Sequence, residues 1–225
     1  MLSINVPLLI VVCLAALAVV CWPRHGLWAR WQLAHALAER IRREDALKHI
    51  LKSEANGRVA TLNSLAGALQ ITTANAASLL EEMEEHELLS FEASGLRLKP
   101  AGREMGLHIV RAHRLWESYL AEQTGVPEIE WHPRAEEQEH LLTPQQTEEL
   151  AAKLGYPTRD PHGDAIPESN GALEADPGQS LNSVNTETPV LIRHIEDEPE
   201  AIYRQLVAIG LRPGMKAFVI EKTAA

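Results

Sequence analysis

The residues best suited to chemistry lie in one stretch of the chain, between His113 and His140. His113 and Glu117 are four positions apart, so on a helix they share one face. A second group of the same residue types follows, on what we expect to be the next helix: His132, Glu136, Glu139 and His140. Imidazole nitrogens and carboxylate oxygens on two successive helices suit a divalent cation. The alternative is a pair of solvated, charged helix faces, and spacing alone does not separate the two.

The composition limits the classes of protein that can supply such a site. The chain has 225 residues, a formal net charge of -10 and only 4% aromatic residues, which favours small helical units with leucine and alanine cores. An acidic chain lacks the basic footprint of sequence-independent nucleic-acid binding. Cys13 and Cys21 both lie in an apolar N-terminal run, so we expect no thiolate ligand, no disulfide framework and a reducing compartment.

The N-terminal run, residues 2–22, is apolar over about 20 positions, enough for one membrane span. No Lys or Arg precedes it, whereas Trp22, Trp28, Trp31 and several arginines follow. This pattern predicts a transmembrane anchor over residues 1–23, an amphipathic juxtamembrane helix over 24–43, and a single-pass protein of the inner or plasma membrane whose soluble part is cytoplasmic. A cleaved signal peptide and a buried helix are the alternatives.

Residues 44–102 read as a winged helix-turn-helix. Helices are expected over 44–53, 61–69 and 73–86, with short strands over 88–91 and 96–98. The helix that would enter a DNA groove carries five glutamates and no Lys or Arg between Thr73 and Leu89, which opposes phosphate contact. The candidates for DNA contact are Thr73, Asn75, Ser78, Arg97 and Lys99. The alternative is a helix-turn-helix that serves only for packing.

A long helix over 103–123 opens a second unit, residues 103–167, which contains the His/Glu stretch. A helix that begins at Thr143-Pro144 and stops at Gly155 follows. Residues 168–188 are rich in Gly, Ser, Pro and acids and predict a flexible linker. Residues 189–225 predict a small unit of strand, helix and strand.

The order of these motifs resembles the diphtheria-toxin-repressor family of metal-dependent regulators, the DtxR/MntR group. The resemblance covers roughly residues 44–167 and rests on His113-Arg-Leu-Trp-Glu117, on Trp131-His132, and on Asp160-Pro-His-Gly-Asp-Ala-Ile-Pro167. The C-terminal segment resembles a FeoA-type SH3-like domain through residues 206–215, cut short before its later strands. The implied fold is mainly α, with a winged helix-turn-helix, a helical metal-binding and dimerisation domain and a small β segment.

The resemblance implies two metal sites. The primary site would use Asp45, Glu136, Glu139 and His140, and the ancillary site His113, Glu117 and His132, with a weaker contribution from Glu198 or Glu200. Carboxylates at positions 45 and 136 match the manganese-type members, and hard oxygen ligands suit Mn(II) or Fe(II). Lys48 stands where the manganese-type pattern has a further carboxylate, which argues against a two-metal manganese site.

The implied function is a metal-responsive regulator, with no enzymatic activity, that binds operator DNA as a metal-loaded homodimer and controls metal uptake. An ion between Asp45 and the second unit would fix the angle between the two units. An alternative is a membrane-anchored, metal-sensing accessory of a metal transporter that no longer binds DNA. A third possibility is a structural dimer that binds no metal tightly.

Overall fold

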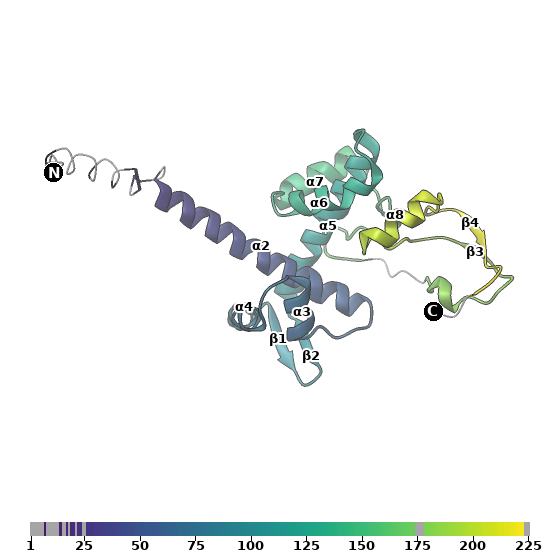
Figure 1. Ribbon diagram of the computed structural model, residues 1–225, viewed down its shortest axis with the longest axis horizontal. Helices are drawn as coiled ribbons and strands as arrows, with labels where there is room; N and C mark the ends of the chain where they lie inside the picture. The colour runs from purple at the N-terminus through teal and green to yellow at the C-terminus, as the bar shows by residue number, and fades with distance from the viewer. Residues whose placement is uncertain are drawn as a thin grey trace, which may run out of the picture.

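The computed structural model describes residues 26–173 and 178–222, together with Pro7, Leu14, Leu17, Val19, Val20, Trp22 and Pro23. Helices dominate, and two small antiparallel sheets complete the architecture (Figure 1). In chain order the elements are α2 (Leu27–Ala55), α3 (Leu62–Ala68), α4 (Thr73–Glu85), β1 (Leu89–Glu92), β2 (Gly95–Leu98), α5 (Pro100–Gln123), η1 (Glu128–Glu130), α6 (Trp131–Glu139), α7 (Pro144–Lys153), η2 (Leu181–Ser183), β3 (Pro189–Leu191), α8 (Glu200–Ala208) and β4 (Lys216–Phe218). This is the mainly helical class that the sequence predicts.

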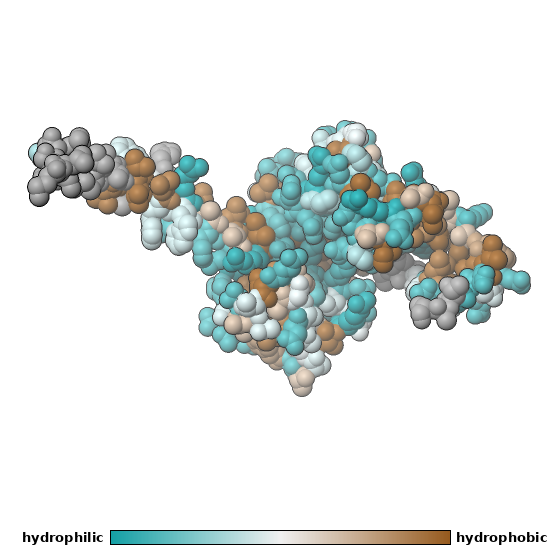
Figure 2. Space-filling model, in the orientation of Figure 1, coloured by the Kyte–Doolittle hydropathy of each residue, from teal (hydrophilic) through white to brown (hydrophobic). Residues whose placement is uncertain are grey.

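Helix α2 is one continuous helix of 29 residues, where the sequence analysis expects two separate helices. Its sequence has no Gly or Pro after Gly26 and is rich in Ala, Leu, Arg, Lys and Glu, which are strong helix formers, so nothing ends it before Asn56-Gly57. The C-terminal half packs into the body of the protein, while the N-terminal half projects away from it (Figure 1). Trp28, Trp31 and Leu33 on the projecting half are exposed. Figure 2 shows hydrophobic residues interspersed with hydrophilic ones along this half of the helix.

The prediction of a single-pass membrane protein is corrected. In the part of the chain that the structure describes, no helix combines the length and the apolar character that crossing a bilayer requires. The anchor predicted over residues 1–23 lies, apart from seven separate positions, outside the described residues.

The winged unit packs α3, α4 and the hairpin β1–β2 around the C-terminal half of α2. Leu47, Ile50, Leu65, Leu80 and Met83 are completely buried in this core. Nearby side chains fix where the helices begin. Thr61 and Ser64 form a capping box on α3, and the Thr72 hydroxyl caps α4. The two strands pair antiparallel with Leu89 opposite Leu98. The helices and hairpin expected between residues 61 and 98 are therefore confirmed to within about two residues.

The second unit is built on α5, which packs against both α6 and α2 (Figure 1). Gly102 makes the contact with the winged unit possible, because a Cβ there would overlap the Leu88 carbonyl oxygen. Leu115, Leu150 and Ile166 form the core beneath α7, whose start is fixed by a capping box between Thr143 and Gln146. This arrangement presents one face of α5 to α6 and the end of α2.

The C-terminal segment forms a small third unit, in which β3 and β4 pair antiparallel beside α8. Tyr203 of α8 donates a hydrogen bond to Glu128 of η1, and Lys52 of α2 forms ion pairs with Glu196 and Glu198. The described residues of this segment form one two-stranded sheet, which does not support the predicted SH3-like assignment. The segment nevertheless lies against the other two units, close to the His/Glu stretch.

Truncating a core leucine of the winged unit should cost far more stability than truncating an exposed one. Leu80→Ala removes a side chain with no exposed surface and should lower the free energy of unfolding by about 2–5 kcal/mol. Leu33→Ala, on the projecting half of α2 where 74% of the side chain is exposed, is the matched control and should change it little. Urea denaturation followed by circular dichroism measures both. Equal midpoints would contradict the packing described for α4.

Candidate metal centre

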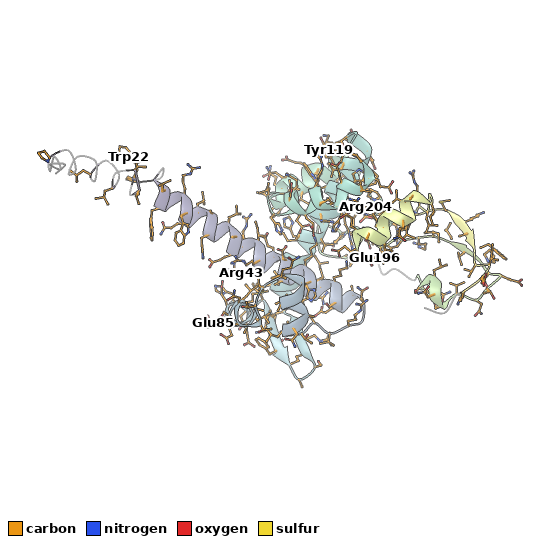
Figure 3. All side chains as sticks on the ribbon, in the orientation of Figure 1. Trp22, Arg43, Glu85, Tyr119, Glu196 and Arg204 are labelled. Carbon is orange, nitrogen blue, oxygen red and sulfur yellow. The ribbon has the colours of Figure 1, made fainter. Side chains whose placement is uncertain are left out.

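Three helices bring the predicted ligands to one region between the winged unit and α6. Helix α5 carries His113 and Glu117 one turn apart, and α6 carries His132 and Glu139 with His140 directly after its end. Helix α2 contributes Asp45. The side chains of α5 and α6 converge because these two helices pack closely along their length. Figure 3 draws the side chains on the ribbon, with Glu196 labelled on the C-terminal segment.

The primary cluster consists of Asp45, Glu139 and His140, and their ligand atoms lie within 4.8 Å of one another. His140 Nε2 is 3.2 Å from Asp45 Oδ1 and 3.5 Å from Glu139 Oε1. His140 Nδ1 lies 2.7 Å from a Glu44 carboxylate oxygen, which leaves Nε2 facing the cluster. Such a carboxylate behind a histidine is the usual way of orienting a metal ligand. Sequence reasoning missed Glu44, although its position next to Asp45 was the available signal.

Glu136, the remaining predicted primary ligand, is not in this cluster. Its side chain is 53% exposed and lies 3.5 Å from His132 Nε2 and 4.0 Å from Lys48 Nζ. With His132 and Glu198 it forms a separate, more exposed group. The pKa of Glu136 falls to about 2, mainly because of the contact with His132.

Lys48 places its ammonium group directly beside the primary cluster. Its Nζ donates to both carboxylate oxygens of Glu139, at 3.0 and 2.9 Å, and lies 3.4 Å from His113 Nδ1. Glu139 is almost completely buried, so this cation compensates a carboxylate that has lost its hydration. Lys48 stands where the manganese-type pattern has a further carboxylate. That position therefore carries a positive charge, which contacts Glu139.

The ancillary cluster consists of His113, Glu117, His132 and Asp197. Glu117 Oε1 lies 3.1 Å from His113 Nε2 and 3.4 Å from His132 Nδ1, and Asp197 Oδ2 lies 2.7 Å from His132 Nδ1. Sequence reasoning expected Glu198 or Glu200 from the C-terminal segment. The structure instead places Asp197, from the acidic run at 196–198, in this cluster.

Glu198 and Glu200, the two acids expected from the sequence, lie outside the ancillary cluster. Glu198 Oε1 is 3.8 Å from His132 Nε2, on the exposed side, and Glu200 pairs with Arg204 at the start of α8.

Two buried carboxylates are held in their charged form by the imidazoles around them. Burial alone would raise the pKa of Glu117, but His113, His132 and His162 together hold it well below its usual range. Burial likewise raises the pKa of Asp197, but the contact with His132 lowers it, and the resulting pKa is about 2. Burial disfavours the imidazolium of His132, yet Asp197, Glu117 and Glu136 raise its pKa to about 12. Without metal, protons on the imidazoles therefore neutralise the carboxylates.

The residues present fit a divalent ion. Glu117 Oε1 and both ring nitrogens of His132 are buried without a well-directed hydrogen bond, although oppositely charged atoms surround them. Buried polar atoms without partners are costly, and a coordinated cation would satisfy them. The donor set is nitrogen and oxygen only, which favours Mn(II), Fe(II) or similar ions over thiophilic ones.

The candidates for DNA contact lie at the surface of the winged unit. Thr73, Asn75 and Ser78 are exposed in the first turns of α4. Arg97 and Lys99 on the wing form ion pairs with Glu92 and Glu87. Both wing cations would have to leave these acids to contact a phosphate.

Comparison with known proteins agrees with the fold. A family model described as the metal binding and dimerisation domain of iron dependent repressors matches residues 99–168. The iron-dependent repressor IdeR of Mycobacterium leprae is 28% identical over 190 residues, covering 77% of this chain and 81% of that protein. A manganese-dependent transcriptional repressor in complex with manganese superposes with a TM-score of 0.72 at 27% identity, covering 80% of this chain and 83% of the other.

A fourth similarity is local. A probable metal transport system membrane protein of Chlamydia trachomatis is 44% identical over 70 residues, which is 31% of this chain. The chain spans only 16% of that protein, so this match does not support the predicted transporter partner.

A winged unit followed by a helical unit that carries clustered histidines and carboxylates is the arrangement shared with these metal-dependent transcriptional repressors. The chain belongs to the DtxR/IdeR/MntR family of metal-dependent transcriptional repressors, because a further manganese-dependent transcriptional repressor is 31% identical to it and is covered over 77% of its length.

In the absence of metal, stability should fall as the pH rises from about 6.5 to about 9. Burial disfavours the imidazolium of His140, but Asp45, Glu44 and Glu139 raise its pKa from 6.5 to about 9. The folded protein holds this proton more tightly than the unfolded chain, so the stabilisation is complete below pH 6.5 and is lost as the pH passes through about 9.

Urea denaturation with a chelator at several pH values measures this loss. His140→Gln should flatten the decline, and His86→Gln, which removes an exposed imidazole at the end of α4, should leave it unchanged. An identical slope in His140→Gln and the wild type would contradict the assigned ion pairs.

Proposed function

We propose that this protein is a metal-dependent repressor that binds Mn(II) or Fe(II), dimerises, and binds operator DNA to control metal uptake. The observation that carries the proposal is the primary cluster, in which Asp45 on α2 meets Glu139 and His140 at the end of α6. An ion held by all three would join the winged unit to the helical unit. The ancillary cluster would add a second ion that involves α5, α6 and the C-terminal segment.

The position of Asp45 explains how an ion would act on the DNA-binding surface. Asp45 immediately precedes the buried residues Ala46 and Leu47, so α2 cannot move at this point without moving the core that carries α3 and α4. Arg40 of α2 also donates a hydrogen bond to the His140 carbonyl oxygen. Metal at the primary cluster would therefore fix the angle of α4, and in a dimer the spacing of two such helices.

The charge of the winged unit shapes the DNA contact that we propose. Helix α4 presents exposed Thr73, Asn75 and Ser78 at its N-terminal end and glutamates at its C-terminal end. Only the N-terminal end is suited to a groove, because the carboxylates would repel the phosphates. Glu82 is partly neutralised by an ion pair with Arg43 of α2, which lies in the same part of the molecule (Figure 3). We expect weak, strongly salt-dependent binding.

Binding to the promoter of the protein's own operon should depend on metal. A gel-shift experiment at low salt with Mn(II) or Fe(II) should show a complex that a chelator removes. Asp45→Asn should weaken the complex, because it removes the α2 ligand that joins the two units. Asn75→Ala should weaken it without changing metal affinity. The absence of any metal-dependent shift in the wild type would refute the repressor function.

Calorimetry with Mn(II) should separate the proposed ligands from their neighbours. Glu139→Gln should lower the affinity of the primary cluster by about tenfold or more, because it removes a charged ligand. Glu137→Gln is the matched control, since Glu137 is exposed on the same helix and in none of the clusters. Equal binding heats for wild type and Glu139→Gln would eliminate the proposed primary site.

A further inference from the structure

His140, which belongs to the primary cluster, lies at the point where α6 ends. It directly follows Glu139, the last residue of the helix, and the Leu141 N–H donates to the Gln138 carbonyl oxygen at 2.9 Å in a tight turn. Carbonyl groups in the last turn of a helix have no partner within the helix. The His140 carbonyl oxygen is one of them, so its partner comes from another part of the chain.

That partner is Arg40 of α2. Its guanidinium donates a hydrogen bond to the His140 carbonyl oxygen, and its Nε lies 3.5 Å from Glu44 Oε1. A positive group suits this position, because the C-terminal end of a helix carries a partial negative charge. Arg40 and Glu44 are one turn apart on α2 and share a face. One guanidinium therefore contacts both the main chain of His140 and the carboxylate behind its ring.

Glu44 extends this contact to the imidazole. Its other carboxylate oxygen, Oε2, lies 2.7 Å from His140 Nδ1, and the proton of this bond is on Nδ1 because a carboxylate can only accept. In the neutral imidazole Nε2 then has no proton, and it faces Asp45 Oδ1 at 3.2 Å. The same helix therefore holds His140 at its carbonyl oxygen, through Arg40, and at its ring, through Glu44.

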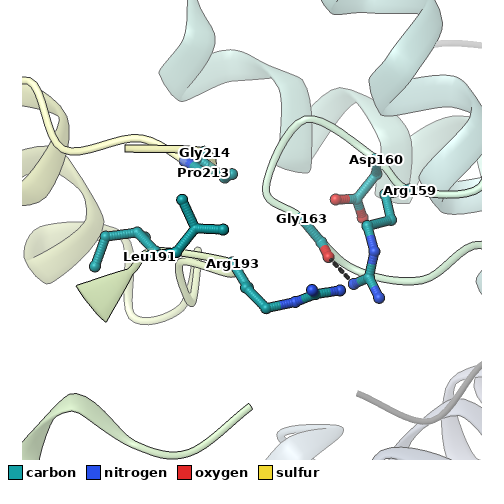
Figure 4. Close-up of a pocket in the computed structure, with 8 residues that line it drawn as sticks. Arg159, Asp160, Gly163, Leu191, Arg193, Pro213 and Gly214 are labelled. Atoms are coloured by element: carbon teal, nitrogen blue, oxygen red, sulfur yellow. Dashed lines mark hydrogen bonds between the residues drawn. The ribbon is translucent and has the colours of Figure 1, made fainter. Parts of the chain in front are cut away.

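Arginine side chains that donate to backbone carbonyls recur in the helical unit. Arg111 donates to the Pro167 carbonyl oxygen at 2.6 Å, and Arg159, beside the pocket in Figure 4, donates to that of Gly163 at 2.7 Å. Both contacts hold the chain after α7 to its own unit. Arg40 differs from them, because it reaches from α2, which carries the core of the winged unit, to the end of α6. It joins the two units at the primary cluster.

We propose that Arg40 is a positioning residue for the metal ion of the primary cluster, acting through the carbonyl group of His140 and through Glu44. This inference rests on the proposed function, because it assumes that the primary cluster binds Mn(II) or Fe(II). Arg40 fixes the end of α6 and the ring of His140 before the ion arrives, so the ion meets a preorganised ligand. Arg40 precedes residues 44–167, which carry the resemblance to the metal-dependent regulators, so the resemblance does not imply this role.

A purely electrostatic role of Arg40 predicts a different outcome. A guanidinium near the cluster repels a divalent cation, so removal of its charge would raise the metal affinity. The positioning role depends instead on the fork shape of the guanidinium, because two separate groups are contacted at once. A lysine keeps the charge but offers a single ammonium group. Arg40→Lys therefore separates geometry from charge.

The test measures Mn(II) affinity by calorimetry on the full chain carrying Glu117→Gln, which disables the ancillary cluster and leaves the primary cluster to be observed. Arg40→Lys should lower the affinity by about tenfold, the lower end of the range for groups that orient a metal ligand. Arg40→Gln should lower it by a smaller factor, because the loss of the positive charge offsets part of the loss of orientation.

Arg42→Lys is the matched control. Arg42 is exposed on the same helix and makes no hydrogen bond or ion pair with any residue that the structure describes. It should keep the full affinity. Urea denaturation with a chelator adds a second readout. Arg40 is half-exposed, and exposed ion pairs contribute little to stability, so Arg40→Lys should leave the midpoint nearly unchanged while the affinity falls.

The possible failures are distinguishable. Unchanged Mn(II) affinity in Arg40→Lys would overturn the role of Arg40 and leave the proposed function intact. A loss of affinity matched by an equal loss of unfolding free energy would assign Arg40 a structural role and would also overturn the proposal. No Mn(II) binding by the protein that carries Glu117→Gln alone would overturn the primary site itself.

Discussion

The structure depends on the neutralisation of carboxylates that are buried where three units meet. Glu117, Glu139 and Asp197 are all largely removed from water, and an unpaired carboxylate there would cost several kcal/mol. Four histidines and Lys48 surround them, contributed by α2, α5, α6 with the residue after its end, and the loop at 160–164. The contact between the units therefore requires cations at these positions, in addition to the apolar packing of α2 against α5.

The two kinds of cation have different consequences. Protons on the imidazoles neutralise the carboxylates in pairs. Several of these contacts are poorly directed, because nitrogens of His132 and His162 lie near carboxylates without a well-directed hydrogen bond. A metal ion bound as proposed would collect the same groups around one centre, which would demand a more exact arrangement of the helices. Lys48 is the exception, because its ammonium is covalently attached to α2 and stays bound to Glu139. It makes part of the neutralisation independent of metal supply.

Most of the fold and much of the site were predictable from the sequence, for local reasons. Capping residues such as Thr61, Thr72 and Thr143 and the break at Gly125-Val-Pro127 mark helix ends directly. The pairs at four-residue spacing, such as His113 and Glu117, lie on one face as expected. The remaining features depend on tertiary contact. No local signal shows that Glu136 turns toward His132, that Asp197 lies in the ancillary cluster, or that α2 is continuous through residue 44.

The continuity of α2 has a mechanical consequence. Between Trp28 and Asp45 the helix rises about 25 Å without a break, because each residue adds about 1.5 Å. The helix has no Gly or Pro along this length, so its projecting half and the half that packs in the winged unit form one rigid rod (Figure 1). A displacement of the exposed end of α2 would therefore rotate the helix at Asp45. A partner that binds the projecting half would therefore change the angle between the winged unit and the helical unit, which is the angle that the proposed metal ion would fix.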